Sequence, residues 1–227
     1  MNKDEPANNS TLNSPPSEPA STSRKGGAKS GGINNLFPVF LKLEELRVLL
    51  IGAGNVGLEK LQALINNAPA TKIRVVAKDV ADSFAALAHQ YKAVEIIKDE
   101  YTPAYLNECD IVIAAVNDIT TSKRISDDAK QKGKLINVAD KPELCDFYLG
   151  SIVTKGSLKL AISTNGKSPT IAKRLKEVFN ELLPEELDEV LNNMQQIRNN
   201  LKGDFKNKVH KLNELTKVLI EDQNSSE

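Results

Sequence analysis

Residues 47–57 read Arg-Val-Leu-Leu-Ile-Gly-Ala-Gly-Asn-Val-Gly, and this stretch decides the fold of the chain. A leucine-rich and β-branched run, typical of a buried strand, leads into Gly52, Gly54 and Gly57, and a helical pattern follows. In this spacing the first glycine permits a tight turn, the second lets the backbone approach a pyrophosphate, and the third lets helix and strand pack closely. The stretch therefore predicts a nucleotide-binding βαβ unit.

The composition is that of an ordinary enzyme. Lys+Arg and Asp+Glu both number 30, so the charge balance gives no reason to expect nucleic acid or a membrane surface as a partner. The chain has no tryptophan, which disfavours a base-stacking surface. Cys109 and Cys145 are far apart and lack metal-ligand spacing, so we interpret them as reduced thiols and expect no protein metal site.

Residues 1–33 are rich in Ser, Asn, Pro, Gly and Lys. Such a segment buries too little apolar surface to offset its ordering entropy, so we predict a disordered tail. It lacks the apolar region of a secretory signal, and no window of the chain approaches the ~18 apolar residues of a membrane span. These features predict a cytoplasmic protein.

Strand-like and helix-like patterns alternate after the tail. Strands are predicted over residues 72–77, 94–97, 110–115 and 134–138, with helices over 79–90 and 120–132. Repeated β-then-α order implies a parallel sheet with right-handed crossovers, that is, an α/β Rossmann-type domain. Ligands of such sheets bind at the carboxyl ends of the strands. This rule selects four segments as candidate site: residues 52–57, 77–79, 116–118 and 139–142.

Two of these segments have alternative interpretations. Asp79 follows the second strand, where an acid often binds the ribose of NAD, but it could equally be the N-cap of a helix. Lys78 beside it could meet a 2′-phosphate, so the choice between NAD and NADP stays open. Asn117 and Asp118 follow the fourth strand and could flank the nicotinamide-side ribose or form a simple turn.

The regular alternation stops after Pro142. Residues 147–154 and 157–163 predict a hairpin around Lys155-Gly156. A hydroxyl-rich turn, Ser163-Thr-Asn-Gly-Lys-Ser-Pro-Thr-Ile171, then opens a helix; it could bind carboxylates or phosphates, or be only a well-capped helix start. Residues 171–220 are helical in pattern and broken by Pro184, and they are too few for a core of their own.

Several motifs together resemble the precorrin-2 dehydrogenase family, which also forms the N-terminal module of siroheme synthases. They are Leu36-Phe-Pro-Val-Phe40, the glycine stretch, Ile113-Ala-Ala-Val-Asn-Asp118, Ile136-Asn-Val-Ala-Asp140 and Leu160-Ala-Ile-Ser-Thr-Asn-Gly-Lys-Ser-Pro169. The similarity extends over residues 36–190. The Asn-Val-x-Asp segment combined with the Ser-Thr-x-Gly-x-Ser-Pro turn is far more specific than the glycines.

The resemblance implies NAD-dependent oxidation of precorrin-2 to sirohydrochlorin, and in some members Fe²⁺ insertion to give siroheme. It implies a homodimer with an NAD-binding Rossmann domain over residues 34–146, a dimerisation and substrate region over 147–180, and a small helical C-terminal domain over 181–227. Asp140 matches the catalytic acid of the family. Asn55, Val56, Lys78 and Asp79 match cofactor-contacting positions.

The substrate of this family carries many carboxylates, which require cations and hydroxyls. We expect them from Lys141, Ser163, Thr164, Lys167 and Ser168. Thr164 stands where relatives usually carry the second serine of a pair, which puts any regulatory phosphorylation there in doubt.

Asp140 follows a central strand, where it could accept a proton from the substrate; the alternative is a turn residue before Pro142. Iron insertion stays open, because no His/Cys cluster marks a metal site and the pyrrole nitrogens would be the eventual ligands. A rival function is a non-catalytic nucleotide-sensing module of the potassium-transport regulatory type, which shares the glycine motif and the Asn-Asp turn. That module usually has an acid directly at the end of strand two, where this chain has Ala77.

Overall fold

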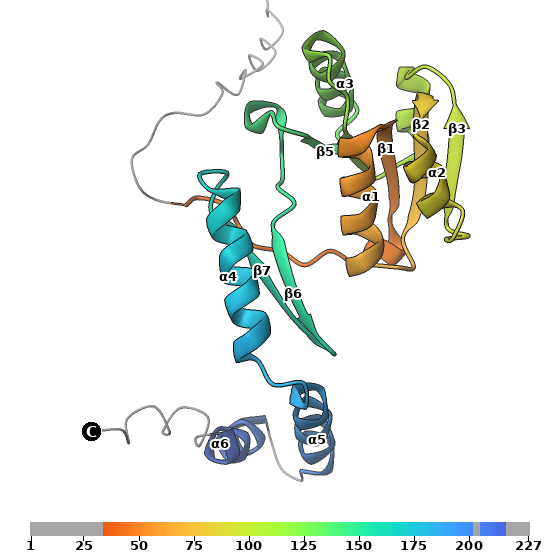
Figure 1. Ribbon diagram of the computed structural model, residues 1–227. Helices are drawn as coiled ribbons and strands as arrows, with labels where there is room; N and C mark the ends of the chain where they lie inside the picture. The colour runs from red at the N-terminus through yellow and green to blue at the C-terminus, as the bar shows by residue number, and fades with distance from the viewer. Residues whose placement is uncertain (1–33, 202–204, 217–227) are drawn as a thin grey trace, which may run out of the picture. The chain divides into compact units, whose positions relative to one another are not determined.

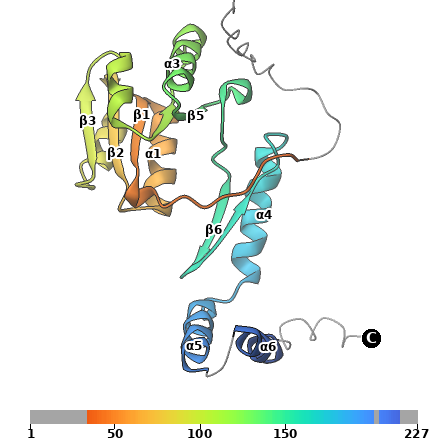
Figure 2. The same ribbon diagram turned by 180° about the vertical axis from the view of Figure 1, so that it is seen from behind.

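The computed structural model describes residues 34–201 and 205–216. The predicted tail, residues 1–33, and parts of the predicted helical region, residues 202–204 and 217–220, lie outside the described residues. The fold is built on a five-stranded parallel sheet in the order β3-β2-β1-β4-β5, of which β3, β2, β1 and β5 are labelled in Figures 1 and 2. The strands are β1 Arg47–Ala53, β2 Lys72–Val80, β3 Val94–Lys98, β4 Ile111–Ala114 and β5 Leu135–Val138. The predicted Rossmann-type sheet is thereby confirmed.

Helices connect the strands. They are α1 Asn55–Asn67, α2 Asp82–Ala88 and α3 Ile119–Gln131, with short 3-10 helices η1 Leu43–Glu45, η2 Pro103–Glu108 and η3 Pro142–Leu144. The strand order reverses between β1 and β4, so the connections after β1 and after β4 diverge from a common point. Such a point is where parallel sheets leave a crevice for ligands at the carboxyl ends of their strands.

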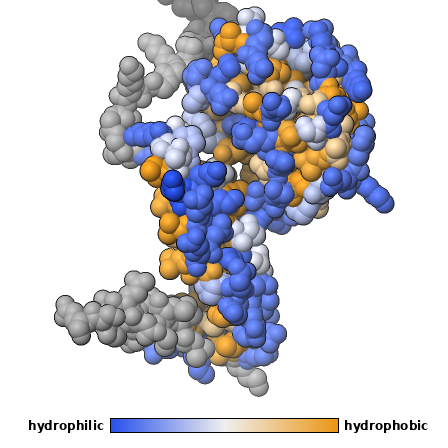
Figure 3. Space-filling model, in the orientation of Figure 1, coloured by the Kyte–Doolittle hydropathy of each residue, from blue (hydrophilic) through white to orange (hydrophobic). Residues whose placement is uncertain are grey.

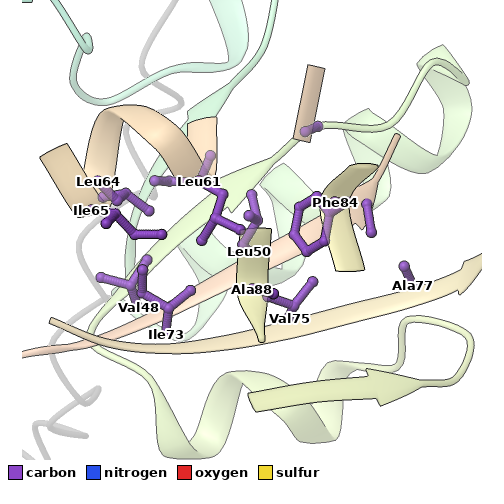
Figure 4. Close-up of a cluster of buried hydrophobic side chains, with 13 residues drawn as sticks. Val48, Leu50, Leu61, Leu64, Ile65, Ile73, Val75, Ala77, Phe84 and Ala88 are labelled. Carbon is purple, nitrogen blue, oxygen red and sulfur yellow. The ribbon is translucent and has the colours of Figure 1, made fainter. Parts of the chain in front are cut away.

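Alternate residues of β1 enter two separate cores, as the period of a strand requires. Val48 and Leu50 pack with α1, α2 and β2, among them Leu61 and Phe84, in the cluster drawn in Figure 4. Leu49 and Ile51 pack on the other side, in a cluster with side chains of α3, β4 and β5. The near-continuous apolar sequence of β1 follows from this burial on both faces.

The end of the second strand differs from the prediction. β2 continues to Val80 rather than ending at Ala77, because the register between β1 and β2 shifts at Gly52 and Ala53 then pairs with Val80. The following helix begins at Asp82 with Ala81 as its N-cap residue. The interpretation of Asp79 as a helix N-cap is therefore wrong, since Asp79 lies within the strand.

The boundaries of β3, β4, β5 and α3 agree with the prediction within one or two residues, whereas the first strand of the hairpin begins at Ser151 rather than at residue 147. α3 ends close to the predicted position, and Gly133 after it has φ +67°, the left-handed geometry expected there. The predicted hairpin forms from β6 Ser151–Lys155 and β7 Leu158–Ile162, with φ +53° at Gly156.

Three helices complete the described chain. They are α4 Pro169–Leu182, α5 Leu187–Asn200 and α6 Phe205–Thr216. The break between α4 and α5 contains Pro184, as predicted. α4 packs on β6, and Ala172 and Val153 are both buried. A search of the described residues finds no helix with the length and apolar character needed to cross a membrane.

Candidate functional site

A cavity of about 610 Å³ opens at the carboxyl ends of β1, β2 and β4, where the strand order reverses. Three of the four segments selected from the sequence line it: residues from 52–57, 77–79 and 116–118. The sequence-predicted residues among its lining are Gly52, Gly54, Asn55, Val56, Lys78, Asp79 and Asn117. The topology therefore brings together most of the side chains expected at a dinucleotide site.

The first and third glycines of the motif are required by packing. A Cβ built on Gly52 would lie 2.3 Å from the carbonyl oxygen of Ala115, and the residue has φ +102°. A Cβ on Gly57 would lie 2.3 Å from the carbonyl oxygen of Gly52, where α1 crosses β1. Neither position has room for a side chain, so these two glycines form the turn and the helix–strand contact that the spacing predicted.

Gly54 is different. A Cβ built on Gly54 meets no atom within 4 Å, and this glycine lines the cavity. Gly54 is also the N-cap residue of α1, and no side chain caps that helix. The first N–H groups of α1 and the positive end of its dipole therefore face open space at the cavity, which is the environment that binds phosphate oxygens.

Lys78 and Asp79, both exposed, form the rim of the cavity at the end of β2. The ammonium of Lys78 lies 3.1 Å from a carboxylate oxygen of Glu100, which follows β3. Asp99 accepts hydrogen bonds from the Tyr105 hydroxyl and the N–H of Glu100, and these bonds lower the pKa of its carboxyl group. Three carboxylates and an ion-paired lysine therefore gather at this rim.

Tyr101 and Arg124 form the wall beside that rim. The Arg124 guanidinium lies 5.6 Å from the centroid of the Tyr101 ring, and it donates a hydrogen bond to the Tyr101 carbonyl oxygen. The buried Tyr101 hydroxyl donates to Asp128, and its pKa is strongly raised by burial and by that carboxylate. These contacts give the wall a fixed geometry.

Four residues of the cavity lining were not predicted from the sequence: Asp99, Glu100, Tyr101 and Arg124. The first three directly follow β3, so applying the rule of carboxyl ends to this strand would have identified them. Arg124 lies within α3, and no sequence pattern that we recognised pointed to it.

Asn117 lines the cavity, whereas Asp118 does not. Asp118 is the N-cap of α3, and its carboxylate accepts a hydrogen bond of 2.6 Å from the N–H of Thr121. Hydrogen bonds from Thr121 lower the pKa of the Asp118 carboxyl group, and the charge of Lys141 adds a smaller effect. Contact between Asp118 and a cofactor stays a prediction.

Asp140 and Lys141 also lie outside the cavity lining. Asp140 is exposed and follows β5 in a turn that the N–H of Lys141 closes on the Val138 carbonyl oxygen. Asp140 has φ +59°, and it is one of two non-glycine residues with a positive φ in residues 34–201 and 205–216. The N–H of Ala139 donates to the Ala114 carbonyl oxygen, so the turn begins at the same edge of the sheet as the cavity. A residue held in this unusual region is a candidate for function.

Three hydroxyl groups of the turn before α4 are engaged within the turn itself. The Ser168 hydroxyl accepts from the N–H of Ile171 and caps α4, and the Thr164 hydroxyl bonds to the backbone of Ser168. The Ser163 hydroxyl accepts from the N–H of Asn165, while Lys167 is exposed. The turn is thus the well-capped helix start that was one of its two interpretations, and a substrate-binding role stays a prediction.

Over the described part of the chain, no group of three or more His, Cys, Asp or Glu side chains is placed to hold a metal ion. Burial raises the pKa of the Cys109 and Cys145 thiols.

The sequence of the chain is similar to known protein families. A family model described as "Putative NAD(P)-binding" matches residues 39–151, and one described as "Sirohaem biosynthesis protein central" matches residues 155–179. A siroheme synthase of Psychrobacter cryohalolentis is 33% identical over 175 residues, which are 77% of this chain and 32% of that protein. Siroheme synthase 1 of Cronobacter sakazakii is 38% identical over 150 residues, 66% of this chain and 31% of that protein.

The chain belongs to the siroheme synthase family. It spans about a third of the length of the curated relatives it matches. A solved structure, "SirC, precorrin-2 dehydrogenase", shares its fold, with a TM-score of 0.62 and 22% identity over 79% of this chain and 89% of that chain. The match to a family model described as NAD(P)-binding supports NAD(P) as the cofactor of this chain.

Proposed function

We propose that this chain catalyses the NAD-dependent dehydrogenation of precorrin-2 to sirohydrochlorin in siroheme biosynthesis. The observation that carries the proposal is the cavity at the reversal of strand order, where the uncapped α1 N-terminus and the open space at Gly54 fit a pyrophosphate. The similarity to siroheme synthases supports precorrin-2 as the substrate.

Bound NAD would supply the hydride acceptor, and the chain would supply position and a proton acceptor. Gly54, Asn55 and Val56 would hold the pyrophosphate through the backbone of the turn and the first N–H groups of α1. Lys78 and Asp79 would face the adenosine ribose, because the end of the second strand receives that half of a dinucleotide. Asn117 would face the nicotinamide half, with Asp118 fixing the start of α3 behind it.

The proton released on dehydrogenation would pass to Asp140. Its carboxylate is exposed, and its turn is held by the hydrogen bond between Ala139 and β4, next to the cavity-lining residue Ala115. The carboxylates of precorrin-2 would meet Lys141 and Lys167, with Ser163, Thr164 and Ser168 offering polar contacts.

Anaerobic incubation of the protein with precorrin-2 and NAD⁺, followed by absorbance, tests the proposal. We expect sirohydrochlorin to form. A folded protein that binds NAD but forms none would instead support the nucleotide-sensing alternative. Adding Fe²⁺ and sirohydrochlorin to the same protein tests whether the chain also inserts iron. In that second reaction Fe²⁺ would be a substrate.

The homodimer and the cytoplasmic location remain predictions within this proposal. The dimer is supported by one face of α4, where Ile171, Leu175, Val178 and Leu182 recur at helical spacing and are exposed; apolar surface is visible along α4 in Figure 3. Light scattering at micromolar concentration measures the mass, and a monomer across that range would contradict the dimer.

A further inference from the structure

We propose that Glu100 determines the coenzyme preference of this chain by holding Lys78 and repelling a 2′-phosphate, so that NAD binds better than NADP. The inference rests on the coenzyme part of the proposed function and not on its substrate. It concerns the rim of the cavity formed by the segments after β2 and β3, a place where the sequence left the choice between NAD and NADP open.

Lys78 is the residue at this rim that a 2′-phosphate would be expected to use, because it is a cation at the end of the second strand. The Lys78 ammonium lies 3.1 Å from the Glu100 carboxylate, with the two side chains 64% and 61% exposed. Both residues line the cavity. A phosphate that recruited Lys78 would therefore have to displace Glu100 or bind beside it.

The other cation of the rim is also engaged. Arg124 lies over the Tyr101 ring and donates to the Tyr101 carbonyl oxygen. This part of the cavity is lined by two cations, Lys78 and Arg124, and by three carboxylates, those of Asp79, Asp99 and Glu100. Their net charge is therefore −1. A dianionic phosphate at this rim meets a net like charge, whereas the two ribose hydroxyls of NAD find carboxylate acceptors.

The expected change in NADP affinity can be estimated from the charge of the Glu100 carboxylate alone. A phosphate dianion and one carboxylate about 6 Å apart in water repel each other by an energy equivalent to roughly 10-fold in affinity. Removing the Glu100 charge ends this repulsion and also frees Lys78. The ratio of the dissociation constant for NADP to that for NAD should therefore fall by about 10-fold in Glu100→Gln, measured by calorimetry at low salt.

Glu95→Gln is the matched control. Glu95 belongs to β3, is also 61% exposed, and pairs with a cation, Arg74, at 3.0 Å. It does not line the cofactor cavity but a second one, near the start of β1 and β2. The variant loses the same unit charge from the protein, and its coenzyme ratio should match that of the unchanged chain.

The double variant Glu100→Gln with Lys78→Met separates attraction from repulsion. If the freed lysine recruits the phosphate, the second substitution should reverse part of the gain in NADP affinity. A fall of the ratio in Glu100→Gln that is absent in Glu95→Gln supports the inference. An unchanged ratio in Glu100→Gln, or an equal change in both single variants, overturns it and leaves the dehydrogenase proposal intact. Absence of binding by either coenzyme overturns both.

Discussion

Two turns of this chain lead into helices in opposite ways. The glycine turn, residues 52–57, begins α1 without a side-chain cap, and its middle glycine faces open space. The hydroxyl turn, residues 163–169, begins α4 with Ser168 as cap and with Thr164 bonded to the backbone of Ser168. One helix start keeps its N–H groups available to a ligand, and the other already engages the N–H of Ile171.

The difference shows that a site is recognised by what a segment leaves unsatisfied. Both turns contain residues that suit anions, and from sequence both were candidates. A helix start without a cap still has its N–H donors and dipole to offer, whereas a capped start has already engaged a donor. The hydroxyl turn can still bind a substrate through Lys167, which is exposed, but with fewer free polar groups.

The strongest test of the glycine turn is Gly52→Ala. The added Cβ would lie 2.3 Å from the carbonyl oxygen of Ala115, and the alanine would have to adopt φ +102°. We expect a loss of about 2–5 kcal/mol in the free energy of unfolding, from overpacking and the left-handed backbone together. Chemical denaturation measures it. Gly133→Ala is the control, since Gly133 has φ +67° with no atom within 4 Å of its Cβ position, and it should lose only about 1–2 kcal/mol.

Gly54→Val tests whether the open space at Gly54 is occupied by the cofactor. A Cβ at this position meets no atom within 4 Å in the folded protein, so the melting temperature should change little. A side chain there would occupy the place of the pyrophosphate, so NAD affinity should fall by about 100-fold or more. Calorimetric titration decides the matter: undiminished NAD binding by the folded variant would remove the glycine turn from the site.

Asp140→Asn extends the comparison to a third turn, one outside the cavity lining. Asparagine tolerates a positive φ well, so the turn with φ +59° should keep its stability. If Asp140 accepts the substrate proton, turnover should fall by about 100-fold while NAD affinity is retained. Steady-state kinetics and thermal melting on one preparation test this. Near-normal turnover would show that Asp140 is a turn residue only.

Ser168→Ala tests the hydroxyl turn and should have the smallest effect. Loss of the cap on α4 should reduce the free energy of unfolding by about 1 kcal/mol, and loss of one neutral polar contact to the substrate should raise the KM for precorrin-2 only slightly. A large rise of this KM at constant stability would show that the Ser168 hydroxyl serves the substrate rather than the helix, and it would contradict the contrast between the two turns.

Much of the fold was predictable because its signals are local. The glycine spacing, the buried strands and the residues at φ > 0 after α3 and in the hairpin are properties of short segments. The shift of register at Gly52 was not predictable in this way, because it depends on how β1 pairs with β2. That register extends β2 to Val80 and turns Asp79 from a possible helix cap into a strand residue at the rim.

The candidate site also has features that the sequence predicts and features that depend on the tertiary structure. By itself, the sequence determined the glycine turn, the parallel alternation, and the placement of Lys78, Asp79 and Asn117 at carboxyl ends of strands. Only the tertiary structure decided that Glu100 pairs with Lys78 and that Arg124 joins the wall. The cap at Ser168 was one of the two interpretations that the sequence left open, and the structure selected it. Turn chemistry and periodicity act over a few neighbouring residues, whereas ion pairs and cavity walls depend on which distant segments the sheet brings together.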